Sequence, residues 1–247
     1  MNIDIVNLIE SNPITKFSGD YQSKLVEKVK HHFTDYEQQL FLSSFYCYLK
    51  YDPKNMKDPS RDYFILSKGH GCGGLYVVLN KYGIISDKDI LDYSTSLGIL
   101  GGHPDMTMVP GAEASTGSLG HGFPTAMGLA LGLKIKNMDN KVFALLGDGE
   151  CHEGTIWESA NVAANLKLGS LCAIIDWNKS GSQLMPIDDL PAKWKSFGWE
   201  VHEIDGHSEV EMKNCFEKLK LTLRPLTSNC RNEFTKLTKS IITFTNK

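Results

Sequence analysis

The sequence predicts an α/β fold, in which helices cover both faces of a doubly wound, mostly parallel sheet. Short apolar runs alternate along the chain with longer stretches whose apolar residues recur at helical spacing. Some of these runs, such as 142–146 and 171–175, are continuous and have no polar residue at every second position, as expected for strands that are buried on both faces. Strands of this kind, joined by helices, build a parallel sheet from repeated β–α–β units.

The elements follow in order along the chain. The first 50 residues are expected to be helical, because apolar residues recur at helical spacing in Leu25 and Val29 and again through 40–49. Apolar runs predict strands at 63–66, 142–146, 171–175, 199–204 and 240–245. Helical patterns predict helices that end near Tyr82 and that span 124–136, 155–168, 191–197 and 208–220.

One long loop interrupts this alternation. Residues 101–122 are rich in Gly, Pro, Ser and Thr, and a loop of this length in a compact domain is usually functional or disordered. Its closely spaced glycine turns favour a functional loop. The sequence contains neither an internal repeat nor a linker, so residues 1–247 are expected to form one domain with an N-terminal helical extension.

Composition excludes several classes of protein. The 247 residues are 41% hydrophobic and 22% charged, which is typical of a globular chain and not of a disordered one. The formal net charge of −3 argues against binding to nucleic acid or to a membrane surface. Six cysteines without a Cys-x-x-Cys pair, and the lack of a basic N-terminal region or of an apolar run of ~20 residues, indicate a cytoplasmic protein with free thiols.

Polar residues follow two of the predicted strands. Asp148 lies between two glycines after the run 142–146, and Asn178 follows the run 171–175. The two residues are 30 positions apart, which leaves room for a helix and a return strand, so neighbouring strands would bring them together. Carboxylate and amide oxygens suit Mg²⁺ or Ca²⁺, and glycines let backbone N–H groups approach a phosphate. The pattern predicts a metal-bridged diphosphate site.

This pattern resembles the signature of thiamine-diphosphate enzymes, a Gly-Asp-Gly turn followed at a similar distance by an Asn-containing turn. Further motifs resemble those of transketolases, in the family's order, at 67–70, 102–104, 116–122, 153–154 and 205–207. The resemblance extends over about residues 37–210 and is to the N-terminal, diphosphate-binding half of the family. It implies the N-terminal subunit of a split transketolase that uses thiamine diphosphate.

The resemblance also implies thiamine diphosphate and Mg²⁺ (or Ca²⁺) as cofactors. Asp148 and Asn178 would bind the metal through their side chains, and Ser180 would bind it through its carbonyl oxygen. Gly149 would donate its backbone N–H to the diphosphate, which His70 would also contact. The cofactor-binding residues implied in this way are His70, Gly117, Leu119, Asp148, Gly149, Glu150 and Asn178.

Four residues are implied to be catalytic by the same resemblance: His103, His70, Glu153 and His31. His103 would lie near the donor hydroxyl and the reactive carbon, and Glu153 would couple two cofactor sites across an interface. Glu153 also begins a predicted helix, where an acidic side chain is favoured as a cap. His31 falls where the family has a histidine, and a competing alignment would place Asp20 there instead.

The implied reaction is the transfer of a two-carbon ketol unit between sugars or sugar phosphates. In the family, the glutamate that activates the cofactor lies on a pyrimidine-binding domain, which the resemblance does not include, so a separate subunit is expected to supply it. Two copies of each chain would form an α2β2 heterotetramer of carbohydrate metabolism. Two other functions stay open: a subunit of another thiamine-diphosphate decarboxylase or acyloin-forming enzyme, and a non-catalytic relic.

Overall fold

The computed structural model describes residues 49–179, 181, 185–187, 189–205, 208, 210–211 and 214–215, and the backbone of 240–246. Nearly all of the first 50 residues, which are predicted to be helical, lie outside these ranges. His31, Asp20 and Ser180 also lie outside them. Within the predicted helix 208–220, the described residues 210, 211, 214 and 215 are helical.

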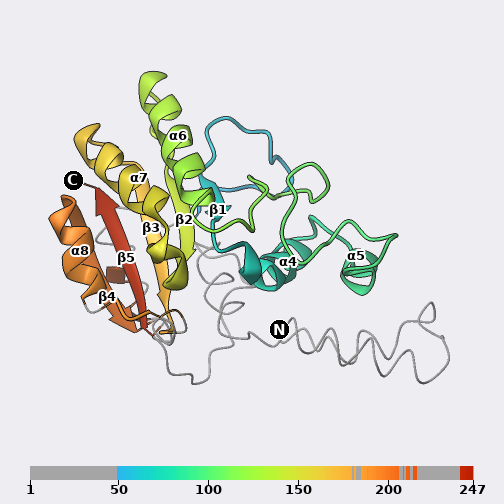
Figure 1. The fold of residues 1–247 in the computed structure, drawn as a ribbon. Coiled ribbons are helices and arrows are strands. Elements are labelled where there is room, and N and C mark those ends of the chain that lie inside the picture. Colours follow the sequence, from blue (N-terminus) through green and yellow to red (C-terminus); the bar gives the residue numbers. More distant parts are fainter. Residues whose placement is uncertain are drawn as a thin grey trace.

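In the described part of the chain, five strands form one sheet in the order β1-β2-β3-β5-β4 (Figure 1). The strands are β1 (Tyr63–Leu66), β2 (Val142–Gly147), β3 (Leu171–Trp177), β4 (Trp199–Asp205) and β5 (Ser240–Asn246). β1, β2 and β3 run parallel to one another, whereas β5 is antiparallel to both β3 and β4. The sheet is therefore mostly parallel, as predicted, with β5 as the reversed strand. A short apolar run does not encode the direction of its strand, so the sequence could not reveal this reversal.

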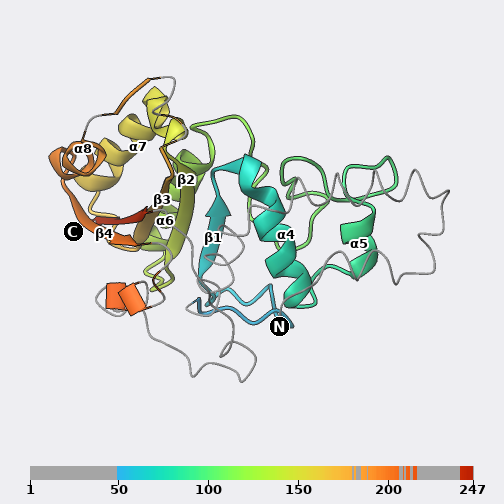
Figure 2. The same cartoon turned by 90° about the horizontal axis from the view of Figure 1, so that it is seen from below.

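Helices cover both faces of the sheet (Figures 1 and 2). The α-helices are α4 (Cys72–Lys81), α5 (Asp87–Leu91), α6 (Gly122–Ile135), α7 (Gly154–Asn165) and α8 (Leu190–Ser196), with short 3₁₀ helices at 69–71 and 149–152. Ala144 and Leu146 of β2 belong to a hydrophobic core that includes α6, α7 and α8. Phe143 and Leu145 belong to a second core, on the opposite face, that includes α4 and α5. These two cores confirm the doubly wound α/β fold.

An aromatic cluster holds α7 and α8 on the sheet. Trp194 of α8 is fully buried, and its ring centroid lies 5.0 Å from that of Trp199, 5.4 Å from that of Trp157 and 5.6 Å from that of Phe123. The indole N–H of Trp199 donates a hydrogen bond to the carbonyl of Ala160 on α7 (3.0 Å). Because α7 begins shortly after β2, this cluster also fixes the turn between them.

The helices of the described ranges are short, and none has the length and apolar character of a membrane span. The shortest α-helix among them, α5, is not predicted by the sequence patterns, because five residues are too few to show helical periodicity. It is instead stabilised by a capping box: the Ser86 hydroxyl accepts from the backbone N–H of Asp89, and the Asp89 carboxylate accepts from that of Ser86 (2.7 Å).

Residues 101–121 form the long loop predicted from the composition, without strands or α-helices. Arg61 binds Glu113 of this loop through both terminal guanidinium nitrogens, and the guanidinium carbon lies 4.2 Å from the ring centroid of Tyr63. The carboxylate of Asp105 accepts a hydrogen bond from the hydroxyl of Ser115 (3.1 Å), which joins two parts of the loop. The loop is therefore held by hydrogen bonds between its own residues and by Arg61, which lies just before β1.

Replacement of Leu79 by alanine tests the core beneath α4. Leu79 is fully buried, so we expect Leu79→Ala to lower the free energy of unfolding by about 2–5 kcal/mol, through lost burial and the cavity left behind. Leu97→Ala is the matched control: that side chain is 86% exposed. There, the same change should alter the free energy of unfolding by less than about 0.5 kcal/mol. Urea denaturation measures both values, and equal effects would contradict the assignment of α4 to the core.

Candidate active site

The carboxyl ends of β1, β2 and β3 bring three polar segments to one edge of the sheet. Residues 67–70 follow β1, residues 148–150 follow β2, and Asn178 follows β3. β2 pairs with both of the other strands, and Gly147 at its end lies opposite Asp176. The backbone N–H of Asp148 donates to the carbonyl of Asp176 (3.2 Å), which continues the pairing beyond the strand. Asp148 and Asn178 therefore follow neighbouring parallel strands, as their spacing predicted.

Asp148 is buried at this edge, with 4% of its surface exposed. Its carboxylate accepts hydrogen bonds from the backbone N–H groups of Gly149 (2.8 Å) and Gly181 (3.3 Å). A Cβ atom on Gly181 would lie 2.6 Å from the Cα of Gly149, so only glycine lets the loop after β3 pack on the turn after β2. A buried carboxylate beside such a turn fits a bound cation, because a cation offsets the cost of burying the charge.

Asn178 is oriented by a charged pair. Its amide nitrogen donates to Oδ2 of Asp176 (3.2 Å), and Nζ of Lys68 lies 2.8 Å from the same oxygen. Lys68 belongs to the segment after β1, so this ion pair joins the ends of β1 and β3 across β2. The sequence motifs include Lys68 only as part of the segment 67–70, and they assign no role to Asp176.

The carboxylate of Glu150 joins three segments in the interior. It accepts hydrogen bonds from the hydroxyl of Ser67 and from the backbone N–H groups of Gly120 (3.0 Å) and Gly147 (3.3 Å). Burial raises the pKa of Glu150, and this effect outweighs the three hydrogen bonds, which lower it. Both carboxylate oxygens are thus bonded to protein donors, and a direct contact between Glu150 and the cofactor stays a prediction.

Two of the predicted histidines lie side by side. The ring centroids of His70 and His103 are 4.6 Å apart, with the ring planes nearly perpendicular, and both residues are exposed. Burial lowers the pKa of His70, and the neighbouring charges of His103 and Lys68 lower it further. The neutral imidazole favoured in this way carries one donor and one acceptor nitrogen.

The loop glycine Gly117 packs directly on this pair. A Cβ atom on Gly117 would lie 2.7 Å from Cδ2 of the His103 ring, and a Cβ atom on Gly69 would lie 2.6 Å from the backbone nitrogen of Gly117. The segment after β1 therefore lies against the long loop with backbone touching backbone. Leu119, two residues further along the loop, is half-buried.

The turn that carries His103 is anchored from α4. The thiol of Cys72 donates to the carbonyl of Gly102 (3.1 Å), and the hydroxyl of Tyr76 donates to the carbonyl of Gly101 (2.9 Å). Burial raises the pKa of both donors, so they keep their protons and their hydrogen bonds at neutral pH. Sequence reasoning missed these anchors, although their spacing of four residues places them on one side of the predicted helix.

Glu153 is exposed at the N-cap of α7, and its side chain makes no capping hydrogen bond. The alternative role for Glu153 as a side-chain cap of this helix is therefore absent. A Cβ atom on Gly120 would lie 2.7 Å from Cβ of Glu153, which places Glu153 beside the loop that contributes Gly117.

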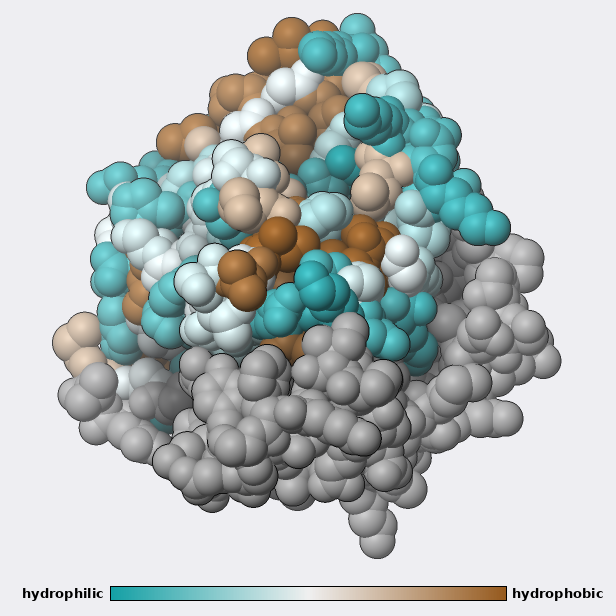
Figure 3. Space-filling view, turned by 90° about the vertical axis from the view of Figure 1, so that its right-hand side faces the viewer, coloured by the Kyte–Doolittle hydropathy of each residue, from teal (hydrophilic) through white to brown (hydrophobic). Residues whose placement is uncertain are grey.

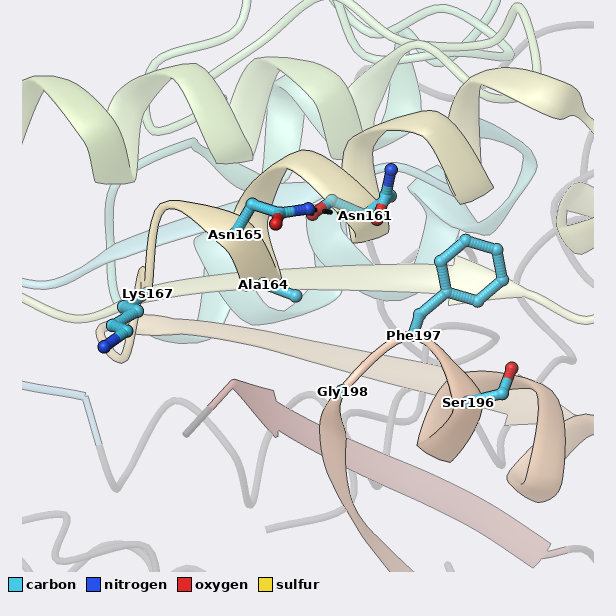
Figure 4. A pocket seen from close by; sticks show the side chains of 7 residues that line it. All are labelled: Asn161, Ala164, Asn165, Lys167, Ser196, Phe197 and Gly198. Atoms are coloured by element: carbon cyan, nitrogen blue, oxygen red, sulfur yellow. Dashed lines mark hydrogen bonds between the residues drawn. The ribbon is translucent and has the colours of Figure 1, made fainter.

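A hollow of about 550 Å³ lies elsewhere, where α7 and α8 end (Figure 4). It is lined by Asn161, Ala164, Asn165, Lys167, Ser196, Phe197 and Gly198. Figure 4 shows Asn161 and Asn165 on α7, opposite Phe197 and Ser196 at the end of α8. None of the predicted site residues lines this hollow, so it is separate from the edge that carries Asp148 and the histidines.

Comparison with known proteins identifies the class to which this fold and site belong. Residues 35–234 match the family described as "Transketolase, thiamine diphosphate binding domain". The chain is thus a thiamine diphosphate-binding domain of the α/β class. It belongs to the transketolase family and corresponds to the N-terminal part of the proteins in that family.

The relatives and solved structures agree with this assignment. The chain is 40% identical, over 76% of its length, to one of the subunits of the apulose-4-phosphate transketolase of Actinobacillus succinogenes, and covers 70% of that protein. It is 37% identical, over 74% of its length, to a 6-deoxy-6-sulfo-D-fructose transketolase subunit of a Clostridium species, and covers 68% of it. The crystal structure of transketolase from Campylobacter jejuni is similar to 75% of this chain, with a TM-score of 0.69 and 28% identity. This chain spans 31% of that longer protein.

Ser67→Ala tests the buried carboxylate. The variant loses one donor to Glu150, and we expect the free energy of unfolding to fall by about 1.5–3 kcal/mol at pH 8. The pKa of Glu150 is already raised in the folded state, so ionisation costs stability as the pH rises through it. A missing donor raises this pKa further, and the loss should therefore shrink as the pH falls and the carboxyl becomes protonated.

The control for this prediction is Thr155→Ala. The Thr155 hydroxyl donates to the carbonyl of Gly120 (2.8 Å), a bond between neutral groups in the same region. Its removal should cost about 1 kcal/mol at every pH. Urea denaturation measures the loss in free energy of unfolding for both variants at several pH values between about 5 and about 8. A loss for Ser67→Ala that does not change with pH would show that Glu150 does not hold its charge as described.

Proposed function

We propose that this chain is the thiamine diphosphate-binding subunit of a transketolase, a transferase that moves two-carbon ketol units between sugars or sugar phosphates. The observation that supports this most directly is the edge formed by β1, β2 and β3, where His70, Asp148 and Asn178 follow adjacent strands and His103 of the long loop contacts His70. By their names, the similar subunits act on apulose 4-phosphate and on 6-deoxy-6-sulfo-D-fructose, so a small ketose with an anionic group is the substrate class we propose. A cytoplasmic location and the organisation of residues 1–247 as one domain stay predictions.

The cofactor would be held by the metal and by backbone groups. Thiamine diphosphate, when bound, supplies a stabilised carbanion for forming and breaking carbon–carbon bonds. Asp148 and Asn178 would bind Mg²⁺ (or Ca²⁺) through side-chain oxygens, with the carbonyl of Ser180 as a third ligand. Gly149 would donate its backbone N–H to the diphosphate. The close packing of Gly149 on Gly181 supports this, because no side chain intervenes between the backbone and a phosphate.

The histidines would act on the diphosphate and on the donor sugar. His70 would bind the diphosphate, and His103 would bind a hydroxyl of the donor next to the bond that breaks. The packing of Gly117 against the His103 ring restricts the directions in which that ring can point, which supports a fixed contact with substrate. Gly117 and Leu119 would lie against the aminopyrimidine, and His31 would serve the acceptor sugar.

The active enzyme would include a second subunit with a pyrimidine-binding fold and the activating glutamate, in an α2β2 arrangement. Exposed apolar surface supports such a partner. α6 carries small or apolar residues on nearly every side and ends in the exposed Ile135, and Leu97, Met106 and Met108 are also exposed. Figure 3 shows apolar side chains over α6 and in the middle of the neighbouring face. Surfaces of this kind mark sites of association, and Glu153 would couple two cofactor sites across one of them.

Asp148→Ala tests the cofactor site. In the complex with the partner subunit, we expect this variant to lose Mg²⁺-dependent binding of thiamine diphosphate, because the diphosphate charge is costly to bury without its cation. Asn178→Ala removes a neutral ligand and should weaken binding less, by about 10-fold to 100-fold. Isothermal titration calorimetry measures both. Unchanged affinity in the Asp148 variant would rule out the proposed metal site.

His103→Ala tests the reaction. With donor and acceptor sugars and the partner subunit present, kcat and kcat/KM should fall together by about 100-fold, since the lost hydrogen bond forms mainly in the transition state. The affinity for thiamine diphosphate should stay near that of the native chain. The native chain without its partner should show no ketol transfer. Full activity of the chain alone would show that the two-subunit proposal is wrong, and equal turnover of the variant would remove His103 from the mechanism.

A further inference from the structure

We propose that Lys68 and Asp176 are positioning residues for the metal: their ion pair fixes the side-chain amide of Asn178 so that its oxygen is presented to the cation. The inference rests on the proposed function, because it takes Asn178 as a metal ligand. It adds two residues to which the sequence motifs assign no such role. It also predicts a preference between two metals, which the proposed function alone does not.

A single carboxylate oxygen carries both contacts. Oδ2 of Asp176 lies 2.8 Å from Nζ of Lys68 and accepts a hydrogen bond from Nδ2 of Asn178 at 3.2 Å. The side chains of Lys68 and Asp176 are 18% and 13% exposed, so water screens the pair much less than it screens a surface ion pair. The ammonium therefore holds the carboxylate in one place, and the carboxylate holds the amide.

The chemistry of the amide sets the direction of its oxygen. A side-chain amide has a donor nitrogen and an acceptor oxygen on opposite sides of one carbon atom. Only the nitrogen can face a carboxylate favourably, because the oxygen would bring two acceptors together. With Nδ2 bound to Asp176, Oδ1 of Asn178 is directed away from Asp176, and this oxygen is the atom of the side chain that a hard cation prefers as a ligand.

The fold brings this pair together from three strands. Lys68 follows β1, and its backbone N–H donates to the carbonyl of Leu145 on β2 (2.9 Å). Its aliphatic chain then crosses the end of β2 at Gly147, where a Cβ atom would lie 3.4 Å from Cδ of Lys68. The ammonium reaches Asp176, which lies opposite Gly147 in the register of β2 and β3. The backbone of Lys68 is thus fixed by its hydrogen bond to β2, and its partner Asp176 is fixed by the pairing of β3 with β2.

Lys68 has one competing role, that of a direct ligand of the diphosphate. Its contact with Asp176 favours the positioning role, because the carboxylate at 2.8 Å already pairs with the ammonium. The two roles differ in their dependence on the metal. A diphosphate ligand contributes to cofactor binding at any metal concentration, whereas a positioning residue matters mainly while the metal is limiting.

The two metals respond differently to a loosely held ligand. Mg²⁺ requires nearly ideal octahedral geometry, whereas Ca²⁺ accepts variable geometry and more ligands. An amide that can rotate should therefore weaken Mg²⁺ binding more than Ca²⁺ binding. A general loss of structure would weaken both metals alike, so the ratio of the two affinities separates positioning from a merely structural role.

The experiment uses the full chain in complex with its partner subunit. Thiamine diphosphate binding is titrated against Mg²⁺ and against Ca²⁺ by calorimetry for the native chain, Asp176→Asn and Lys68→Met. Asp92→Asn is the matched control, since it makes the same change in the surface pair of Lys88 and Asp92. Asp176→Asn should lower the apparent affinity for Mg²⁺ by about 10-fold. It should lower that for Ca²⁺ by about threefold or less. At saturating Mg²⁺ the affinity for thiamine diphosphate should match that of the native chain, and Asp92→Asn should change nothing.

The outcomes separate this inference from the proposed function. A native complex without metal-dependent binding of thiamine diphosphate would overturn both. Native binding together with unchanged, or equally weakened, Mg²⁺ and Ca²⁺ affinities in Asp176→Asn would overturn only the positioning role. Weaker cofactor binding by Lys68→Met at saturating metal would make Lys68 a diphosphate ligand instead. Lys68→Arg keeps the positive charge and should restore most of the Mg²⁺ affinity lost in Lys68→Met; failure to do so in a folded variant would also count against the pair.

Discussion

The buried carboxylate of Glu150 is the interaction on which the site depends. A charged group in the interior is costly unless donors surround it, and here three donors come from three separate segments: Ser67 after β1, Gly120 in the long loop and Gly147 at the end of β2. The cost of burial therefore makes the arrangement cooperative, because displacement of any one segment leaves the carboxylate under-satisfied. The loop 101–121 has no regular structure of its own, and this carboxylate is one of the contacts that fix it to the sheet.

The segment 67–70 connects the two halves of the site. Its four residues each contact a different partner. The four contacts are Ser67 with Glu150, Lys68 with Asp176, Gly69 with Gly117 and His70 with His103. Two of these partners belong to the half of the site that carries the metal ligands, and two belong to the loop that carries the second histidine. A short turn after an edge strand thereby sets the distance between the cofactor side and the sugar side of the site.

Sequence reasoning reached the architecture and the main polar residues because both are encoded locally. Strand β1 has the predicted bounds, and the apolar runs at β2 and β3 differ from the observed strands by one or two residues at their ends. The convergence of Asp148 and Asn178 followed from their positions after two apolar runs. The direction of β5 and the short helix α5 escaped prediction, since one depends on pairing and the other on a capping box.

The supporting contacts could not be predicted, because their partners are distant in sequence. Lys68 and Asp176 are 108 positions apart, and Ser67 and Glu150 are 83 apart, so neither pair leaves a periodic signal. Glu150 illustrates the limit: the family resemblance implies a cofactor contact, and the sequence held no sign of the protein donors that its carboxylate accepts from in the fold. Local motifs identify the chemistry of a site, and tertiary structure decides which of its side chains face the ligand.

The arrangement around 67–70 constrains how the chain can change over generations. A substitution at any of these four positions alters two parts of the molecule together, so a compensating change must arise in a segment far away in the gene. Each of the four positions is therefore coupled energetically to a partner in another part of the chain. The side chains of Leu97, Met106 and Met108 are exposed in this chain, so a substitution there disturbs no buried contact within the chain. A change in this exposed surface can therefore adapt the chain to a partner without a compensating change in its interior, whereas a change in the segment after β1 cannot.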